Sequence, residues 1–220
     1  MRITQFTVNV GGYDHLPKVP PVIGKDVDYI YLTDSGPDAG PPWQTIRVKP
    51  EHPDPRYESR RLWIRSVDVL PECDVSLMHG GASQLMVNPV KLVNRYMTDD
   101  VQIVVREHPD RTSVKQEVEA VRRFHKDMSK MPQRQYAHYL AAGFPDDRGL
   151  SSTGIMIYRH TDEVAEFQRL WWQEVERWLH RCQLSGDYVI WLTGIKVRTV
   201  PNKKWNKIIM RRKHKKPRGW

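Results

Sequence analysis

The chain lacks the sequence features that mark several specialised classes of protein. Its 220 residues include two cysteines, Cys73 and Cys182, too few for the disulfide framework of a small secreted domain. No apolar run approaches the ~18–20 residues that span a membrane. The first residues enter a strand pattern directly, so we expect no signal peptide. These absences predict one globular domain in a reducing compartment, and we expect a cytoplasmic location, the host cytoplasm if the protein is viral.

Two phosphate-binding motifs are missing as well. The chain has no G-x-x-x-x-G-K-[ST] sequence, and no G-x-G-x-x-G follows the first expected strand. The sequence therefore carries no fingerprint of a P-loop NTPase or of an NAD-type dinucleotide-binding domain.

Acidic residues are absent from the last twenty positions. Those positions hold nine of the 35 Lys and Arg, so residues 1–200 are balanced and the C-terminal end carries the net charge of +9. Clustered cations interleaved with aromatic residues such as Trp205 and Trp220 are typical of segments that bind nucleic acid. The alternative interpretations are a solvated end, or a contact with the anionic surface of an oligomer or of a membrane.

We therefore expect a domain over residues 1–200 and a basic tail over residues 201–220. Deletion of residues 203–220 is expected to leave the domain folded, because the domain is charge-balanced without them. DNA is the partner that we expect for the tail, bound through its phosphates. The candidate nucleic-acid contacts are Lys203, Lys204, Lys207, Arg211, Arg212, Lys213, Lys215, Lys216 and Arg218.

Hydrophobic periodicity predicts strands that alternate with helices. This alternation favours an α/β fold, a single Rossmann-like domain with a mostly parallel central sheet flanked by helices. The segment 188–192 is apolar enough to be a strand, although residues 189–192 could continue a helix. Strands are expected over 3–10, 27–32, 44–48, 74–78, 101–105, 153–158, 188–192 and 195–200, and helices over 58–70, 90–97, 113–125, 133–142 and 162–179.

The end of the 74–78 strand is the most informative site in the sequence. It runs into His79, Gly80 and Gly81, and ligands of α/β proteins bind outside the carboxyl ends of strands. A glycine pair lets the backbone approach a ligand closely, and a histidine can bind a metal or carry a proton. The alternative is a tight strand-to-helix turn with one exposed histidine.

Several short strings in a fixed order resemble a known family. The order is similar to that of a GT-A-type glycosyltransferase-like family, long a domain of unknown function, which includes plant hexosyltransferases of mucilage and cell-wall synthesis. The resemblance covers roughly residues 6–190 and implies a single GT-A domain that uses a nucleotide-sugar donor, with a UDP-sugar expected. The strings include Asp28-Tyr29-Ile30-Tyr31-Leu32-Thr33-Asp34, Asp54-Pro55-Arg56, Asp74 to Gly81, His108-Pro109-Asp110-Arg111 and Arg181-Cys182-Gln183-Leu184-Ser185.

The resemblance also implies roles for individual residues. Asp34 matches an acidic residue that could contact the base or ribose of the donor, and Arg56 and Arg60 match a basic pair suited to phosphate. Apart from the resemblance, His108 follows a buried strand at the same edge as His79 and could act as a general base, with Asp110 as the alternative; the other interpretation is a polar turn that caps the next helix. Ser152 is also a catalytic candidate, near a position where the family commonly has a glutamate. The full set of candidate donor-binding residues is Gly11, Tyr13, Asp34, Arg56, Arg60, His79, Gly80, Gly81, Arg181 and Gln183.

The chain departs from the family at three acidic positions. The family has aspartates where this chain has Gly80 and Cys182, and commonly a glutamate near Ser152. These losses predict an altered or absent divalent-metal site, with weak or no dependence on magnesium or manganese. His79, His160 and Cys182 could instead form a softer site that suits zinc. Otherwise, arginines could neutralise the diphosphate without metal, or the protein no longer catalyses.

The sequence thus predicts a hexosyltransferase that moves a sugar from a nucleotide-sugar to a hydroxyl acceptor. The basic tail makes hydroxymethylated pyrimidine bases in viral DNA one expected acceptor. The donor is expected at the carboxyl edge of the strands 3–10, 27–32 and 74–78. The alternative function is that of a catalytically inactive protein of this fold that binds nucleic acid through its tail.

Overall fold

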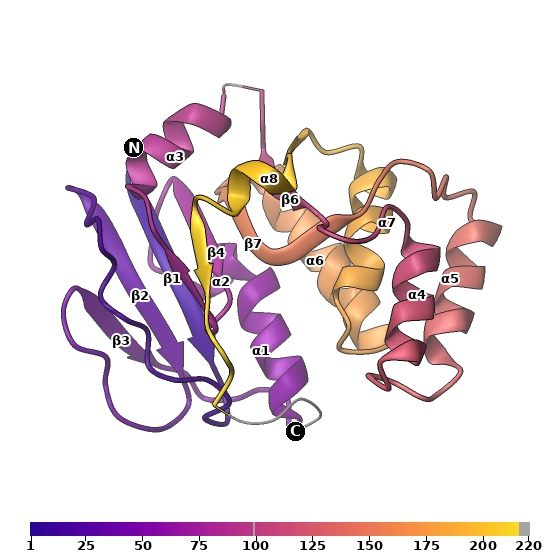
Figure 1. Ribbon diagram of the computed structural model, residues 1–220, viewed down its shortest axis with the longest axis horizontal. Helices are drawn as coiled ribbons and strands as arrows, with labels where there is room; N and C mark the ends of the chain where they lie inside the picture. Colours follow the sequence, from indigo (N-terminus) through magenta and orange to yellow (C-terminus); the bar gives the residue numbers. More distant parts are fainter. Residues whose placement is uncertain (99, 216–220) are drawn as a thin grey trace.

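The computed structural model describes residues 1–98 and 100–215 (Figure 1). A seven-stranded sheet with the order β3-β2-β1-β4-β7-β6-β8 forms its centre. The strand β7 is antiparallel to its neighbours β4 and β6, whereas the other neighbouring pairs are parallel. The strands are β1 (Ile3–Asn9), β2 (Val27–Thr33), β3 (Trp43–Arg47), β4 (Val75–His79), β6 (Ile103–Glu107), β7 (Ser151–Arg159) and β8 (Val197–Val200).

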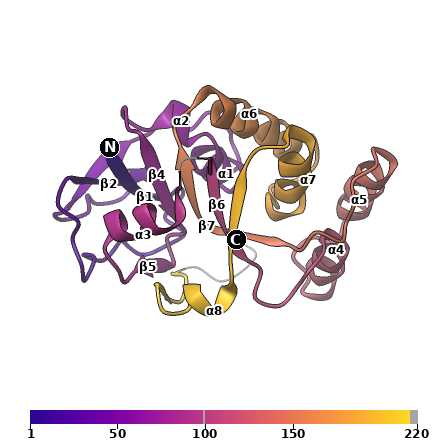
Figure 2. The same cartoon turned by 90° about the horizontal axis from the view of Figure 1, so that it is seen from above.

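Helices cover one face of this sheet and extend beyond its end. The helices α1 (Pro55–Ile64), α2 (Ser66–Val69), α6 (Asp162–Arg177) and α7 (Gln183–Thr193) lie on this face, and Figure 2 shows them together on one side. The helices α4 (Val114–Arg123) and α5 (Met131–Ala141) pack beside α7 at the end of the sheet. Alternate strand residues such as Phe6, Val8 and Met78 supply the core between the sheet and these helices.

The opposite face of the sheet is covered by shorter elements. They are α3 (Pro89–Tyr96), α8 (Asn202–Trp205) and a two-stranded sheet of β5 (Ser83–Leu85) and β9 (Ile209–Arg211). Their side chains pack on the strand residues of the other parity, such as Val75 and Leu77. The predicted α/β domain with a mostly parallel sheet flanked by helices is therefore confirmed. Within the described residues, no helix is long and apolar enough to cross a membrane.

Local sequence signals explain most helix starts. Asp54 caps α1 by accepting a hydrogen bond from the Arg56 amide, with proline in the first turn. Ser113 and Thr161 cap α4 and α6 in the same way. The predicted helix 58–70 is divided at Arg65, whose ψ of 39° ends α1 before α2 begins.

The predicted strand over 188–192 is wrong, because these residues belong to α7. An apolar run carries no period that separates a buried strand from a buried helix. Tyr188 and Val189 are buried and packed among helices, and Gly194 ends the helix in the left-handed conformation, with φ of 66°.

The segment beyond residue 200, which the sequence predicted to be a basic tail, packs on the rest of the domain in the structure. Trp205 is fully buried beneath α3, and Ile208 and Ile209 are also buried. The guanidinium of the buried Arg106 donates to the side-chain oxygen of Asn202. The strand β9 pairs with β5, and Figure 1 shows this segment running along the sheet. The predicted contacts Lys216 and Arg218 lie outside the described residues.

Replacement of Trp205 by alanine should therefore destabilise the whole domain. Removal of a fully buried tryptophan costs about 3–5 kcal/mol of unfolding free energy. Urea denaturation of Trp205→Ala and of the control Lys203→Ala, an exposed neighbour, checks this expectation. Deletion of residues 202–220 should leave no cooperative unfolding transition. Equal unfolding midpoints for the wild type and Trp205→Ala would show that the segment contributes nothing to the fold.

Candidate functional site

A cavity of about 800 Å³ opens at the carboxyl ends of β1 and β2. Its lining includes Asn9, the last residue of β1, and Tyr31, which lies two residues before the end of β2. Its rim is formed by the loops that follow these strands, over residues 12–18 and 35–37. Arg212, Lys213 and Lys215 of the C-terminal segment line it from the other side. The cavity thus lies at the strand edge where the sequence predicted a donor site.

Side chains from the strand ends hold the first loop in shape. The Asn9 side-chain amide donates to the Asp14 carbonyl at 3.0 Å and to the Tyr31 hydroxyl at 3.1 Å, and its oxygen accepts from the Asp14 amide at 2.9 Å. The Asp34 carboxylate accepts from the Gly11 amide at 3.0 and 3.1 Å. Gly11 and Gly12 have φ of 66° and 63°, a region that favours glycine. Asp34 therefore positions this loop beside the cavity.

The cavity is positively charged. Its lining includes four Lys or Arg side chains and one carboxylate, that of Asp14. The Asp14 carboxylate lies 2.6 Å from the His214 ring, and the four cations outnumber it. A cavity lined in this way favours an anionic ligand.

The two glycines after His79 differ in their surroundings. A Cβ atom on Gly81 would lie 2.5 Å from an Asp14 carboxylate oxygen, so this position requires glycine while that loop is in place. A Cβ atom on Gly80 would meet the Trp63 ring at 3.6 Å, an ordinary contact. The position of Gly80 thus has room for a Cβ atom, although the chain has no side chain where the family resemblance implies an aspartate.

A second group of cations lies on the Trp63 side of Gly80. The Arg60 guanidinium stacks over the Trp63 ring at 4.3 Å. Arg181 is half-buried, and its Nε atom has no hydrogen-bond partner within the described residues. Burial, followed by the charges of Arg181, Arg56 and Arg60, lowers the pKa of His180 to about 4. Arg56, Arg60 and Arg181 therefore share one region, which suits an anion, whereas His180 is neutral at pH 7.

The remaining donor-binding candidates lie either beside the large cavity or beside the cations near Trp63. Tyr13 lies in the first loop against His214, with ring centroids 4.8 Å apart, and Gln183 begins α7 next to Arg181 and Cys182. The Arg56 guanidinium is held by the Asp54 carboxylate at 2.6 Å. The two sides meet at Gly80 and Gly81. The candidate donor residues are thus brought to one edge of the sheet, whereas their roles stay predictions.

The three candidate zinc ligands do not come together. His79 is buried, and its ring nitrogens contact the Gln5 side chain at 3.1 Å and the Gly80 carbonyl at 3.2 Å. His160 follows β7 at the opposite end of β4, where its amide bonds to Asp74. Residues 1–98 and 100–215 contain no group of three His, Cys, Asp or Glu that could hold a metal ion.

The donor set also does not fit magnesium or manganese. Gly80 has no side chain, and the buried Cys182 lies 3.6 Å from the Thr153 hydroxyl. Gly80 donates its amide proton to the carbonyl of Gly154, the next residue after Thr153. The two positions where the family has aspartates thus share one neighbourhood without a carboxylate. Hard divalent cations prefer oxygen ligands, which this pair does not supply.

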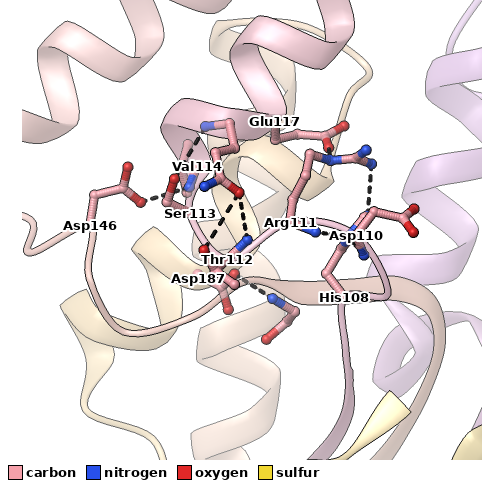
Figure 3. A network of polar contacts seen from close by, with 11 residues as sticks. His108, Asp110, Arg111, Thr112, Ser113, Val114, Glu117, Asp146 and Asp187 are labelled. Atoms are coloured by element: carbon pink, nitrogen blue, oxygen red, sulfur yellow. Dashed lines mark hydrogen bonds and ion pairs between the residues drawn. The ribbon is translucent and has the colours of Figure 1, made fainter. Parts of the chain in front are cut away.

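The candidate catalytic residues lie on or after β7 and β6, farther along the sheet than β1 and β2. Figure 3 shows the polar contacts of His108 and Arg111 in the loop after β6. The amides of Asp110 and Arg111 donate to His108 Nδ1, and the Arg111 guanidinium lies 2.7 Å from His108 Nε2. Burial, followed by the Arg111 charge, lowers the pKa of His108 to about 4. The ring is therefore neutral at pH 7, and its nitrogens are occupied by its own loop. His108 organises this loop in the structure, and its role as a base stays a prediction.

Neither Asp110 nor Ser152 lines the large cavity. Asp110 is exposed. Ser152 belongs to β7, is buried, and pairs with Arg106 of β6. The strand β6 is three positions from β1 in the sheet, roughly 14 Å at the usual strand spacing. A reaction at the cavity would therefore need groups other than these, or a substrate that reaches across the edge.

Sequence reasoning missed several residues at this edge. Asn9 belongs to no quoted string, and Tyr31 and Asp14 were given no role at the site; their convergence follows from the pairing of β1 with β2. Asp187 also gave no signal, because its segment was predicted to precede a strand. It accepts from the Ser151 amide at 2.8 Å, and burial raises its pKa. It lines a second cavity of about 340 Å³ beside α7.

Comparisons with known proteins support the resemblance seen in the sequence. The model of the TOD1/MUCI70 glycosyltransferase-like domain matches residues 42–214, a range that includes the C-terminal segment. The comparison with curated proteins gives no match. One similar solved structure is the galactosyltransferase LgtC in complex with donor and acceptor sugar analogs, with 12% identity and a TM-score of 0.49 over 84% of this chain and 70% of that chain. Another is mouse xyloside xylosyltransferase 1 in its apo form, with 8% identity and a TM-score of 0.47 over 89% of this chain and 84% of that chain. With TM-scores below 0.5, these two add no weight to the family match.

Acidification should destabilise the fold through its buried histidines. Burial lowers the pKa of His79 from 6.5 to about 4. Between these values the unfolded chain binds a proton that the folded chain does not, so the free energy of unfolding falls as the pH falls from 6.5 towards 4. For His79 the loss between pH 7 and pH 4.5 is on the order of 2 kcal/mol.

Urea denaturation at these two pH values measures the effect. His79→Gln should lose less stability on acidification than the wild type, whereas the control His125→Asn, an exposed position, should lose the same amount as the wild type. An identical pH dependence in the wild type and His79→Gln would contradict a neutral, buried His79.

Proposed function

Because this chain belongs to the TOD1/MUCI70 glycosyltransferase-like family, we propose that it transfers a sugar from a nucleotide-sugar donor to a hydroxyl acceptor. The observation that carries this proposal is the positively charged cavity at the carboxyl ends of β1 and β2. A site at these strand ends is where α/β sheets bind nucleotides. A UDP-sugar is the first donor to test.

The leaving nucleoside diphosphate is the group that the site must stabilise. Negative charge develops on it as the bond to the sugar breaks, and fixed positive charge lowers the energy of that transition state. Arg60 stacks over the Trp63 ring next to Gly80, with the charge of Arg181 nearby, and the basic lining of the cavity lies beyond Gly81. Arginine binds phosphate oxygens in pairs of hydrogen bonds. We therefore propose a transfer that uses these cations in place of a divalent metal.

The acceptor part of the proposal rests on exposed charge. Lys203, Lys204, Lys207 and Arg211 are exposed on α8, β9 and the turn between them. These cations support an acceptor that is itself an anion. We propose that this acceptor is DNA that contains hydroxymethylated pyrimidines. A catalytically inactive protein that binds nucleic acid through the same surface is the competing proposal. The two differ in whether sugar is released from the donor.

Donor binding should be strong without metal and should depend on Arg60. Calorimetric titration with UDP-glucose, UDP-galactose and GDP-mannose should give the same affinity in EDTA and in magnesium. Arg60→Ala should weaken binding and donor hydrolysis about tenfold, as expected for a charged hydrogen bond. The control is Arg65→Ala. Arg65 follows the last residue of α1, the helix that contains Arg60, and its guanidinium is paired with the Asp68 carboxylate at 2.5 Å. This variant should bind the donor as the wild type does.

Two outcomes would refute parts of this proposal. Activity that is lost in EDTA and restored by magnesium alone would refute the metal-free mechanism. Donor binding without hydrolysis or transfer to any hydroxyl acceptor would favour the inactive protein.

DNA binding should depend on the exposed lysines. A Lys203→Ala/Lys204→Ala/Lys207→Ala variant should lose affinity for duplex DNA, and the slope of log K against log salt should become shallower by about 2.7, since each phosphate contact contributes roughly 0.9. A control variant with Lys91, Lys115 and Lys130 changed to alanine removes the same charge from exposed sites elsewhere. Equal slopes for the two variants would remove the support for a DNA acceptor.

A further inference from the structure

The C-terminal segment is fixed where it reaches the large cavity. The strand β9 pairs with β5 in the register Leu85 to Ile209 and Ser83 to Arg211. The Arg212 amide then donates to the Ala82 carbonyl at 2.7 Å. The strand β5 directly follows the glycine pair at the end of β4, so this pairing carries the next residues of the segment to the cavity.

Arg212 ties two loops together at this point. Its guanidinium donates to the Gly81 carbonyl at 2.9 Å and to the Leu16 carbonyl at 3.3 and 3.4 Å. The first carbonyl belongs to the loop after β4 and the second to the loop after β1. Both partners are neutral, so Arg212 holds the segment and keeps its full positive charge at the cavity wall.

The three residues that follow alternate in direction. His214 pairs with the Asp14 carboxylate at 2.6 Å and lies against Tyr13, whereas Lys213 and Lys215 line the cavity. This alternation is that of an extended chain. Neither lysine has an ion-pair partner within residues 1–98 and 100–215. Two uncompensated ammonium groups are thus presented to the cavity, and His214 anchors the chain between them.

We infer that Lys213 and Lys215 bind the diphosphate of the donor, with Arg212 as the residue that positions them. This inference rests on the proposed function and assigns the segment to the donor site. Gly80, which precedes the Gly81 that Arg212 contacts, has no carboxylate to hold a metal ion, so the segment would supply the positive charge that a metal ion would otherwise bring. The location argues against duplex DNA as the ligand of these two lysines, because they line a cavity of about 800 Å³ with Asn9 and Tyr31 also in its lining.

Titration of the intact protein with inorganic pyrophosphate, UDP and uridine tests the inference. Lys213→Ala/Lys215→Ala should bind pyrophosphate and UDP at least tenfold more weakly than the wild type, because charged hydrogen bonds to phosphate are lost. Its affinity for uridine should not change, and EDTA should not alter any of these affinities. The control Lys115→Ala/Lys130→Ala loses the same charge on α4 and before α5 and should behave as the wild type.

The outcomes separate this inference from the proposed function. Pyrophosphate affinity that is absent in the wild type, or equal in the wild type and Lys213→Ala/Lys215→Ala, overturns the inference. A wild type that binds pyrophosphate through these lysines but binds no UDP-, GDP- or ADP-sugar contradicts the proposed function and leaves the diphosphate site in place. Thermal unfolding of both variants, which change exposed side chains, checks that they are folded.

Discussion

Docking of the C-terminal segment on the sheet is the interaction on which the candidate site depends. Trp205 is fully buried between this segment and α3, and β9 extends the small sheet begun by β5. Hydrophobic burial of about 1.5–3 kcal/mol for a large side chain favours this position over a solvated tail. The docked segment brings Arg212, Lys213 and Lys215 to the cavity at the ends of β1 and β2. Without it, the cavity would lose one wall and most of its positive charge.

The distribution of charge at the carboxyl edge gives the site its chemical character. Gly80 and Cys182 supply no carboxylate, and cations outnumber carboxylates in the lining of the cavity. Arg60 lies next to Gly80 with the charge of Arg181 nearby, and the C-terminal cations lie beyond Gly81. Under the proposed function, these cations would supply the positive charge that the leaving diphosphate requires.

Much of the fold could be predicted from the sequence, because alternation, caps and prolines are local signals. The apolar run around Val189 was ambiguous because a fully buried helix and a fully buried strand look alike over few residues. The packing of the C-terminal segment could not be predicted in this way, because its Lys and Arg are typical of a ligand-binding or solvated tail, whereas the burial of Trp205, Ile208 and Ile209 depends on long-range contacts. The edge of the sheet that holds the site was predictable from strand ends. The convergence of Tyr31 with the basic segment depends on long-range pairing that no short motif encodes.

A structure of the protein bound to UDP in the presence of EDTA tests the central claim most directly. The account predicts that the nucleotide occupies the cavity at the ends of β1 and β2. It also predicts that its phosphate oxygens lie within hydrogen-bond distance of Lys213 and Lys215. A diphosphate bound elsewhere, or bound only when a divalent cation bridges it to residues near Gly80 and Cys182, would contradict the account.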